Sequence, residues 1–196
     1  LRRDMNLSLF DFDGTLTTKD SLGEFLKYKI SKSQYSLNMM RFLPYFLLWQ
    51  SRIISNAKAK EKLFSIFYKG MDEVEFKKRS FGFSMEILDN IIHHERFVAM
   101  KKHQQMGDRV VVVSASMQCW LQPWCEKNSV ELLCTELEFK DGRFSGRFAT
   151  KNCHGVEKVN RINALLNPKI YPTVYAYGDS SGDDAMLELA HIATKF

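Results

Sequence analysis

The sequence predicts an α/β protein with a doubly wound, Rossmann-like parallel sheet, an inserted helical cap domain and a β-hairpin. A short apolar strand at residues 7–10 runs directly into an acidic turn. A continuous β-branched run at residues 110–113 is typical of a parallel strand that is buried on both faces. Strand and helix patterns then alternate toward the end of the chain, which favours a doubly wound core.

The length of the chain, 196 residues, suits one core domain plus an insertion. Residues 19–94 show long stretches with helical spacing, few glycines and many aromatic and basic side chains. We therefore expect a helical cap domain over 19–94 and a core domain formed by 1–18 and 95–196. Four residues of the types that begin helices are expected at the N-termini of the cap helices: Asp20, Ser33, Ser55 and Asp72.

The elements of the second half follow from the turn and breaker residues between apolar runs. Residues 138–148 are typical of a hairpin that turns at the Asp-Gly pair 141–142. A helix is expected at 157–166, because the Asn-Pro pair that follows stops it. The remaining strands are expected at 132–134, 174–177 and 191–194.

The charge balance is mildly basic, with 28 Lys and Arg against 23 Asp and Glu, a net charge of +5 and a pI near 9.0. The mean hydropathy of −0.28 indicates a soluble protein. A basic surface attracts phosphate-bearing partners of every kind. The chain lacks the dense Lys/Arg run of a nucleic-acid-binding tail, so no nucleic-acid partner is expected.

The four cysteines and the N-terminal region indicate a cytoplasmic protein. The cysteines form no CxxC pair and have no His at zinc spacing, so we expect them to be reduced. No apolar stretch of signal-peptide length follows the first basic residues, and Met5 is expected to be the natural start. The most apolar stretch, 39–54, is interrupted by polar residues and Pro, and falls short of the ~20 apolar residues needed to cross a bilayer.

Several acidic residues follow the expected strands, at the sheet edge where open α/β folds bind ligands. Packing carboxylates together costs Coulomb energy unless a cation neutralises them. Mg²⁺ is the first candidate, because it takes oxygen ligands from few carboxylates and also accepts phosphate oxygens. The groups expected at this edge are Asp11, Asp13, Asp179 and Asp183, with Ser114 and Lys158 beside them.

The most specific motif is Asp-Phe-Asp-Gly-Thr at residues 11–15. It is followed in order by Val-Ser-Ala-Ser at 113–116, by Lys158 at the end of 152–158, and by Gly-Asp-Ser-Ser-Gly-Asp at 178–183. These four motifs resemble the nucleophile loop, the phosphate-binding serine turn, the lysine motif and the acidic motif of the haloacid dehalogenase superfamily. Over almost its whole length, the chain is similar to the phosphoserine-phosphatase-like branch, which has a helical cap.

The resemblance implies a phosphatase that forms an aspartyl-phosphate. Asp11 would be the nucleophile, and Asp13 would protonate the leaving group and then activate water. Mg²⁺ would bind side-chain oxygens of Asp11 and Asp179 and the backbone carbonyl of Asp13. Asp183 would belong to the metal site by orienting a metal-bound water or Lys158. The residues implied to hold the phosphate are Lys158 and Ser114 through their side chains, and Gly14, Thr15 and Ala115 through backbone N–H groups.

Some of these residues also have a purely structural interpretation. Lys158 alone would be a solvated helix lysine, and Ser114 alone a helix N-cap. Asp20 lies where the resemblance implies a contact with a substrate amino group, and it is an equally good N-cap. The chain departs from phosphoserine phosphatases at 115–116, where Gly-Gly is common, and at Gly182, where Asn is common. These departures leave the substrate open.

The other candidates are interpreted as structural residues. His93, His94 and His103 have no carboxylate at useful spacing, so we expect them at the surface. Cys153 has no His to ionise it and is expected to pack in the interior. Two sets of aromatic residues at helical spacing are expected in the core: Phe42, Tyr45, Phe46 and Trp49 in the cap, and Trp120 and Trp124.

Two other functions remain open beside hydrolysis of a small soluble phosphomonoester. The apolar, basic cap and a layout similar to phosphatidylglycerophosphatase C favour a lipid-phosphate phosphatase. Such an enzyme would contact the inner face of the membrane through residues 39–49. The other alternative is a non-catalytic phosphate-binding module. A dehalogenase is disfavoured, because those relatives attack carbon without a metal and lack the second acid that Asp13 provides. The oligomeric state is not set by the sequence.

Overall fold

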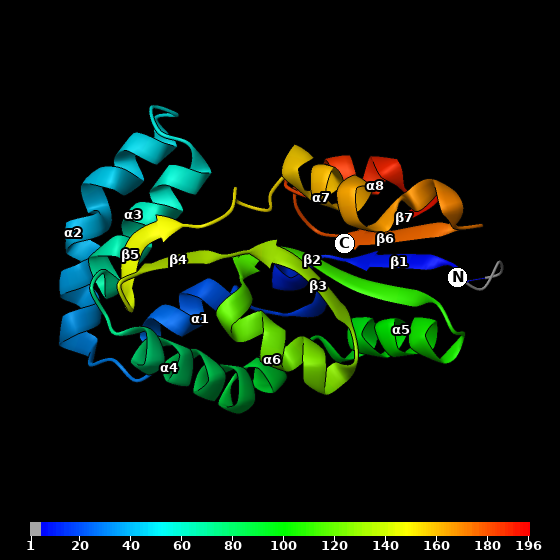
Figure 1. Ribbon diagram of the computed structural model, residues 1–196. Helices are drawn as coiled ribbons and strands as arrows, with labels where there is room; N and C mark the ends of the chain where they lie inside the picture. The colour runs from blue at the N-terminus through cyan, green and yellow to red at the C-terminus, as the bar shows by residue number, and fades with distance from the viewer. Residues whose placement is uncertain (1–4) are drawn as a thin grey trace.

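A computed structural model of the protein describes residues 5–196 and has an α/β fold (Figure 1). Its central sheet has five parallel strands in the order β3-β2-β1-β6-β7. The hairpin forms a separate antiparallel pair, β4-β5. All the expected strands are therefore present. They span β1 (Leu7–Phe10), β2 (Arg109–Met117), β3 (Glu131–Thr135), β4 (Leu137–Lys140), β5 (Arg143–Phe148), β6 (Val174–Gly178) and β7 (Ile192–Lys195).

Helices cover both faces of the sheet, as a doubly wound fold requires (Figure 1). Four of them flank the sheet: α5 (His94–Gln105) and α6 (Gln118–Asn128) on one face, α7 (Val156–Leu166) and α8 (Asp184–Leu189) on the other. Successive residues of a strand point to opposite faces. Val110 and Val112 accordingly pack in the cluster with α5 and α6, and Val111 and Val113 in the cluster with α7 and α8.

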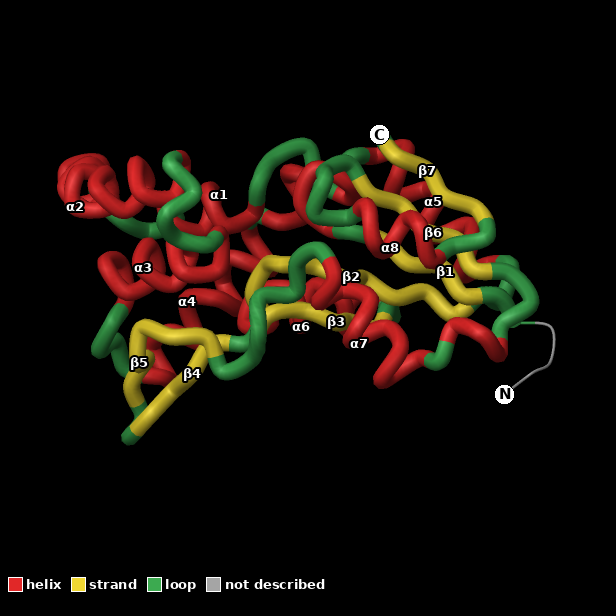
Figure 2. Tube along the Cα trace, turned by 90° about the horizontal axis from the view of Figure 1, so that it is seen from above, coloured by secondary structure: helices red, strands yellow, loops and turns green. Residues whose placement is uncertain are grey.

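A helical insertion joins β1 to β2 and lies beyond the carboxyl ends of the strands (Figures 1 and 2). Asp20, Ser55 and Asp72 accept hydrogen bonds from first-turn N–H groups, as expected. The prediction that Ser33 caps a helix was wrong. Ser31 is the N-cap and accepts from the Gln34 N–H at 3.2 Å, because the helix begins two residues earlier than expected. The insertion contains α1 (Ser21–Lys27), α2 (Lys32–Gln50), α3 (Asn56–Tyr68) and α4 (Glu73–Glu86), and single turns lie at Phe12–Leu16, Leu88–Ile91 and Pro168–Ile170.

An aromatic core connects the insertion to the sheet and the hairpin. Phe76 of α4 lies 5.6 Å from Phe144 of β5 between ring centroids. Trp120 of α6 stacks on Phe25 of α1 at 4.5 Å. Trp120 and Trp124 are both buried in this cluster, which confirms the core expected for them. The residue numbers at which a cap domain would divide from the core domain stay a prediction.

The surface of α2 is largely apolar and exposed. Phe42 is buried, but Met40, Leu43 and Leu47 are 69%, 53% and 54% exposed. The prediction that the aromatic residues of this helix pack in the core is therefore confirmed for Phe42. It is wrong for Trp49, which is exposed at the C-terminal end of the helix. Among residues 5–196, no helix is both long enough and apolar enough to cross a membrane.

His103 is buried, and its expected place at the surface was wrong. Its Nδ1 atom lies 2.7 Å from Asp108 Oδ2, and its Nε2 atom lies 2.8 Å from the Tyr177 hydroxyl. The carboxylate partner stands five residues later, in the turn before β2, so helical spacing alone did not reveal the pair. His94 is exposed, as expected.

Candidate active site

The carboxyl ends of β1, β2 and β6 meet at one cavity of about 280 Å³, because these strands are neighbours in the sheet. We call it the acidic cavity. Its buried side, the floor, is formed by Asp11, Ser114, Lys158 and Asp183. Its exposed or half-buried side, the rim, is formed by Asp20, Asn56, Lys60 and His154, and between the two lie Asp13, Ala115 and Asp179.

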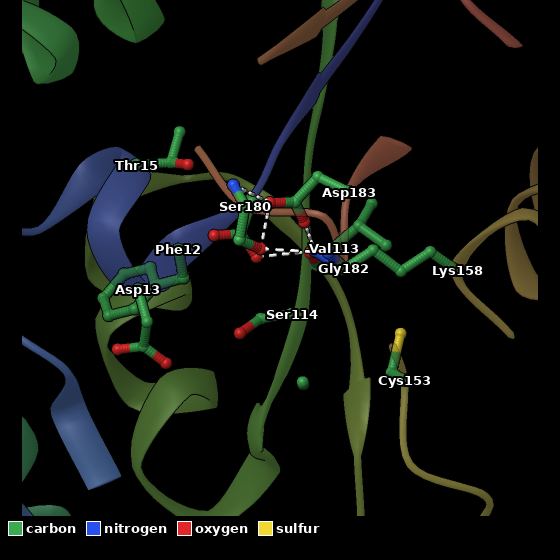
Figure 3. Close-up of polar contacts among 12 residues, drawn as sticks. Phe12, Asp13, Thr15, Val113, Ser114, Cys153, Lys158, Ser180, Gly182 and Asp183 are labelled. Carbon is green, nitrogen blue, oxygen red and sulfur yellow. Dashed lines mark hydrogen bonds and ion pairs between the residues drawn. The ribbon is translucent and has the colours of Figure 1, made fainter. Parts of the chain in front are cut away.

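Lys158 is the central cation of the floor. Its ammonium lies 2.5 Å from Asp11 Oδ1 and 2.6 Å from Asp183 Oδ1, and donates to the Val113 carbonyl at 2.7 Å (Figure 3). Burial disfavours the charged form, but the two carboxylates outweigh it and raise the pKa of Lys158. The side chain is buried, so the solvated-lysine interpretation is wrong.

Asp11 follows β1 and lies in the floor with too little positive charge around it. Burial raises its pKa to about 7, with Asp183 and Asp13 adding to the rise and Lys158 opposing it. One ammonium is shared by two carboxylates, and Asp179 brings a third: oxygen atoms of Asp11, Asp179 and Asp183 lie within 4.8 Å of one another. Such an oxygen-rich, anionic set fits a hard divalent cation such as Mg²⁺.

Asp183 orients Lys158 and the loop that follows β6. While Oδ1 contacts the ammonium, Oδ2 accepts from the Ser180 N–H at 3.0 Å and from the Ser180 hydroxyl at 2.9 Å. Burial works against its ionised form, but Lys158 and these hydrogen bonds lower the pKa of Asp183. Both oxygens are therefore occupied within the protein.

Asp13 has a different environment from Asp11, although only one residue separates them. Its Oδ1 accepts from the Ser21 N–H at 2.6 Å, and the Ser116 hydroxyl donates to Oδ2. The Asp13 carboxylate points away from the Lys158 ammonium (Figure 3). Burial, followed by the nearby charge of Asp20, raises the pKa of Asp13. Ser116, where the chain departs from the family pattern, thus holds the candidate acid.

The turn after Asp11 requires a glycine at position 14. Gly14 has φ +80°, and a Cβ there would lie 2.2 Å from Asp179 Oδ2. Its N–H donates to Thr17 Oγ1 at 3.2 Å, and the Thr15 hydroxyl donates to Asp179 Oδ1 at 3.2 Å. Arg96, at the start of α5, donates to the carbonyls of Gly14 and Thr15. No local pattern in the sequence pointed to this arginine.

Ser114 and Asp20 lie in the cavity, as predicted. Ser114 belongs to β2 and does not begin a helix, so the N-cap interpretation is wrong for it. Its Oγ accepts from the Ser116 N–H at 3.0 Å. Asp20 caps α1 through the Gly23 N–H at 2.8 Å and also lines the rim, so the capping interpretation is confirmed and the substrate contact stays a prediction.

Three rim residues were missed by the sequence reasoning: Asn56, Lys60 and His154. Asn56 and Lys60 stand one helical turn apart on α3, a spacing that places both on one face. His154 lies beside Cys153, which is buried, and burial raises the pKa of the Cys153 thiol to about 11. The thiol is therefore a packing group, as expected.

Comparison with known proteins shows the family. Residues 8–188 match the family model of the haloacid dehalogenase-like hydrolases, so the chain belongs to this family. Protein CicA of Caulobacter vibrioides is 30% identical over 188 residues, which cover 94% of this chain and 82% of that protein. The histidinol-phosphatase of Neisseria meningitidis serogroup C is 25% identical over 194 residues, covering 94% of this chain and 86% of that protein.

Solved structures show the same fold. A protein of unknown function from Bordetella pertussis Tohama I has a TM-score of 0.81 at 21% identity, covering 97% of this chain and 89% of that one. Phosphoserine phosphatase in its apo form has a TM-score of 0.67 at 18% identity, covering 98% of this chain and 86% of that one. The chain therefore shares its fold with phosphoserine phosphatase and belongs to the haloacid dehalogenase-like hydrolases.

Proposed function

We propose that the chain is a magnesium-dependent phosphomonoester hydrolase that forms an aspartyl-phosphate on Asp11. The observation that supports this most is the contrast between the two acids of one turn. Asp11 faces Lys158 in the floor, whereas Asp13 is held by Ser21 and Ser116. Two carboxylates in different environments are suited to different tasks, here nucleophile and proton donor.

In the first step, an Asp11 oxygen attacks phosphorus and the bond from phosphorus to the ester oxygen breaks. Asp13 gives its proton to the departing oxygen, and its raised pKa favours the protonated form that this needs. In the second step, the Asp13 carboxylate takes a proton from a water that attacks the same phosphorus. The bond to Asp11 breaks, inorganic phosphate leaves, and the proton returns the enzyme to its starting state.

The rest of the site supports these steps through charge and orientation. Mg²⁺, when bound, neutralises carboxylate and phosphoryl oxygens, and Asp11, Asp179 and the Asp13 carbonyl would hold it, with Asp183 beside them. Lys158 offsets the charge that gathers on Asp11 and the phosphoryl group. The remaining phosphate contacts are assigned to the Ser114 hydroxyl and to backbone N–H groups of Thr15 and Ala115. The Gly14 N–H, which was also expected to bind phosphate, donates to Thr17 Oγ1 at 3.2 Å, so Gly14 is assigned to the turn.

A hydrolysis screen with Mg²⁺ tests the proposal. The wild type and Asp11→Asn are assayed over soluble and lipid phosphomonoesters, with Asp141→Asn, in the hairpin turn far along the chain, as the matched control. We expect turnover in the wild type and the control, and none measurable in Asp11→Asn. A folded Asp11→Asn protein with near-normal turnover would contradict the mechanism.

A lipid phosphate at a membrane surface is the second candidate substrate, and α2 supports it. Residues 25–60 contain seven Lys and Arg and no Asp or Glu. Within this acid-free segment, Met40, Leu43 and Leu47 expose apolar side chains. An apolar face among basic residues is complementary to an anionic bilayer, which attracts each nearby basic residue by about 1 kcal/mol. The occupant proposed for this face is the inner, cytoplasmic leaflet, a location that the four free cysteines also fit.

Vesicle binding tests this second candidate. In low salt, the protein should co-sediment with vesicles containing phosphatidylglycerol and leave neutral phosphatidylcholine vesicles unbound. The double variant Leu43→Ser and Leu47→Ser should not bind. Val74→Ser, which changes an exposed side chain of α4, is the control and should leave binding unchanged. Failure to bind anionic vesicles, together with preference for a small soluble phosphoester, would remove the lipid candidate and leave the phosphatase proposal standing.

A further inference from the structure

Only one of the two lysines lining the acidic cavity is already paired. Lys158 contacts two carboxylates in the floor. Lys60, on α3, lines the rim and has no carboxylate within 4.0 Å among residues 5–196. Its neighbour Glu61 is directed to the hairpin, where it accepts from the Phe148 N–H at 2.8 Å. Lys60 therefore presents a free positive charge to whatever enters the cavity.

The imidazole of His154, which lines the same cavity as Lys60, fits there because residue 182 is a glycine. A Cβ at Gly182 would lie 2.5 Å from His154 Nε2 and 2.8 Å from Cδ2, so the ring occupies the space of a side chain at 182. Gly182 stands directly before Asp183 in the loop at the floor (Figure 3). The Gly155 N–H donates to the Gly182 carbonyl at 2.8 Å, which joins the two loops. Cys153, on the other side of His154, is fully buried and anchors the histidine loop.

Asn56 completes this side of the rim. It lies one turn before Lys60 on α3, and its Oδ1 accepts from Asn152 Nδ2 at 3.3 Å, which leaves its own amide N–H groups for another acceptor. The positive charge of Lys60 acts on His154, where it adds to burial in lowering the pKa of the imidazole. Asp20 acts instead on Asp13. The basic and acidic groups of the rim thus sit near different parts of the cavity.

We propose that Lys60, Asn56 and His154 form a second anion subsite, which binds an anionic group carried by the alcohol part of the substrate. This rests on the proposed function, because it takes a phosphomonoester as the substrate. The anion is a carboxylate or a phosphodiester, since both offer oxygen acceptors to an ammonium, an amide and an imidazole. The subsite selects among phosphomonoesters, whereas the floor acts on the phosphoryl group that all of them share.

Matched substrates test the lysine. 3-Phosphoglycerate and glycerol 3-phosphate differ by one carboxylate, and glycerophosphoglycerol phosphate carries a phosphodiester instead. Of the two substrates with a second anionic group, the subsite should accept at least one, and for that substrate Lys60→Met should lower kcat/KM about tenfold. For glycerol 3-phosphate, the same variant should change kcat/KM less than about twofold. Lys58→Met, exposed on the same helix, is the control. Equal losses on all three substrates would assign Lys60 to the phosphoryl group, and no loss on any would leave it without a role; either result overturns the subsite.

A double-mutant cycle tests the histidine. His154→Ala and Gly182→Ala should each reduce the preference for the anionic substrate by about threefold to tenfold, because the new Cβ displaces the ring. In the His154→Ala background, Gly182→Ala should cause no further loss, since the Cβ then meets empty space. Losses that multiply, or a preference unchanged by Gly182→Ala, would remove His154 from the subsite.

Binding to the Asp11→Asn protein separates this proposal from the mechanism. With Mg²⁺ present, calorimetry should show tighter binding of the anionic substrate than of glycerol 3-phosphate, and Lys60→Met should remove the difference. Such a result without turnover in the wild type would retain the subsite and overturn the phosphatase mechanism. If the wild type turns over normally and Lys60→Met leaves the ratio of the two binding constants unchanged, the phosphatase mechanism would be retained and the subsite overturned.

Discussion

The floor and the rim of the acidic cavity are close in space but differ in how their charges are satisfied. In the floor, Lys158 is buried and held by Asp11 and Asp183 within 2.6 Å. In the rim, Lys60 is half-buried and has no carboxylate partner among residues 5–196, and His154 is exposed. A buried charge must be paired, whereas an exposed one is stable in water.

This difference separates reaction from recognition. Charges fixed in a buried network need no rearrangement when charge develops during the reaction, which is the arrangement that favours catalysis. Charges left open at the rim gain a partner only when a substrate arrives. Changes in the floor should therefore affect every substrate and the stability of the protein, and changes in the rim should affect only the choice of substrate.

Lys158→Met should have the largest effect, because it leaves two buried carboxylates without their cation. We expect kcat/KM to fall about a thousandfold for every phosphomonoester. The free energy of unfolding of the metal-free protein should fall by about 3 kcal/mol. Urea denaturation and steady-state kinetics measure both, with the exposed Lys151→Met as the control. A loss confined to one substrate would break the distinction between floor and rim.

Gly14→Ala should lower activity about a hundredfold, the effect expected for a displacement of about 1 Å at a reacting group. The added Cβ would meet the Asp179 carboxylate. Gly107→Ala is a matched control, because Gly107 has φ +81°, close to the +80° of Gly14, and open space at its Cβ. Both variants carry the backbone strain, so only the difference between them reports the clash. Equal activity in the two would show that Asp179 is not displaced.

Ser116→Ala should reduce kcat about tenfold by removing one hydrogen bond to Asp13. KM should change little, since the serine contacts the acid and lies outside the phosphate contacts assigned above. Ser36→Ala on α2 is exposed and serves as the control. The kcat of Ser116→Ala should recover in part with p-nitrophenyl phosphate, whose leaving group needs no proton. Identical losses on both kinds of substrate would argue against the role of Ser116.

A separate expected effect, on stability and not on turnover, concerns the pH dependence of the metal-free protein. The pKa of Asp11 is raised from 3.8 to about 7 in the folded state, so folding takes up a proton between these values. Stability from this group is complete below about pH 4 and is lost as pH rises through about 7. Relative to Asp11→Asn, the wild type should therefore lose stability from pH 4 to 7. Parallel curves for the two proteins would contradict the raised pKa.

Local patterns predicted the floor because its residues follow strands. The acidic turn after 7–10, the β-branched run 110–113 and the acidic turn after 174–177 each mark a strand end, and a parallel sheet gathers such ends at one edge. Asp11, Ser114 and Asp183 were found in this way. Lys158 reaches the floor from α7, and the resemblance to the family favoured a functional role for it over that of a solvated lysine.

The rim could not be predicted in the same way, because it depends on packing between distant segments. Asn56 and Lys60 reach the cavity only through the placement of α3 against the core. His154 does so only because Gly182, many residues later, leaves room for its ring. The contacts of Arg96 with the turn after Asp11, and of His103 with Asp108, likewise form only in the folded chain, and no local sequence pattern predicts them.

Capture of the phosphorylated enzyme tests the central claim most directly. Asp13→Asn is mixed with p-nitrophenyl phosphate and Mg²⁺, quenched in acid and digested for mass spectrometry. Because nitrophenolate leaves without a proton, Asp11 should still attack, while the missing base slows hydrolysis of the product. We predict one phosphoryl group on Asp11, removed by hydroxylamine and absent from a protein that also carries Asp11→Asn. Release of nitrophenolate and phosphate together with no phosphorylated peptide, or a phosphoryl group on another residue, would contradict the account.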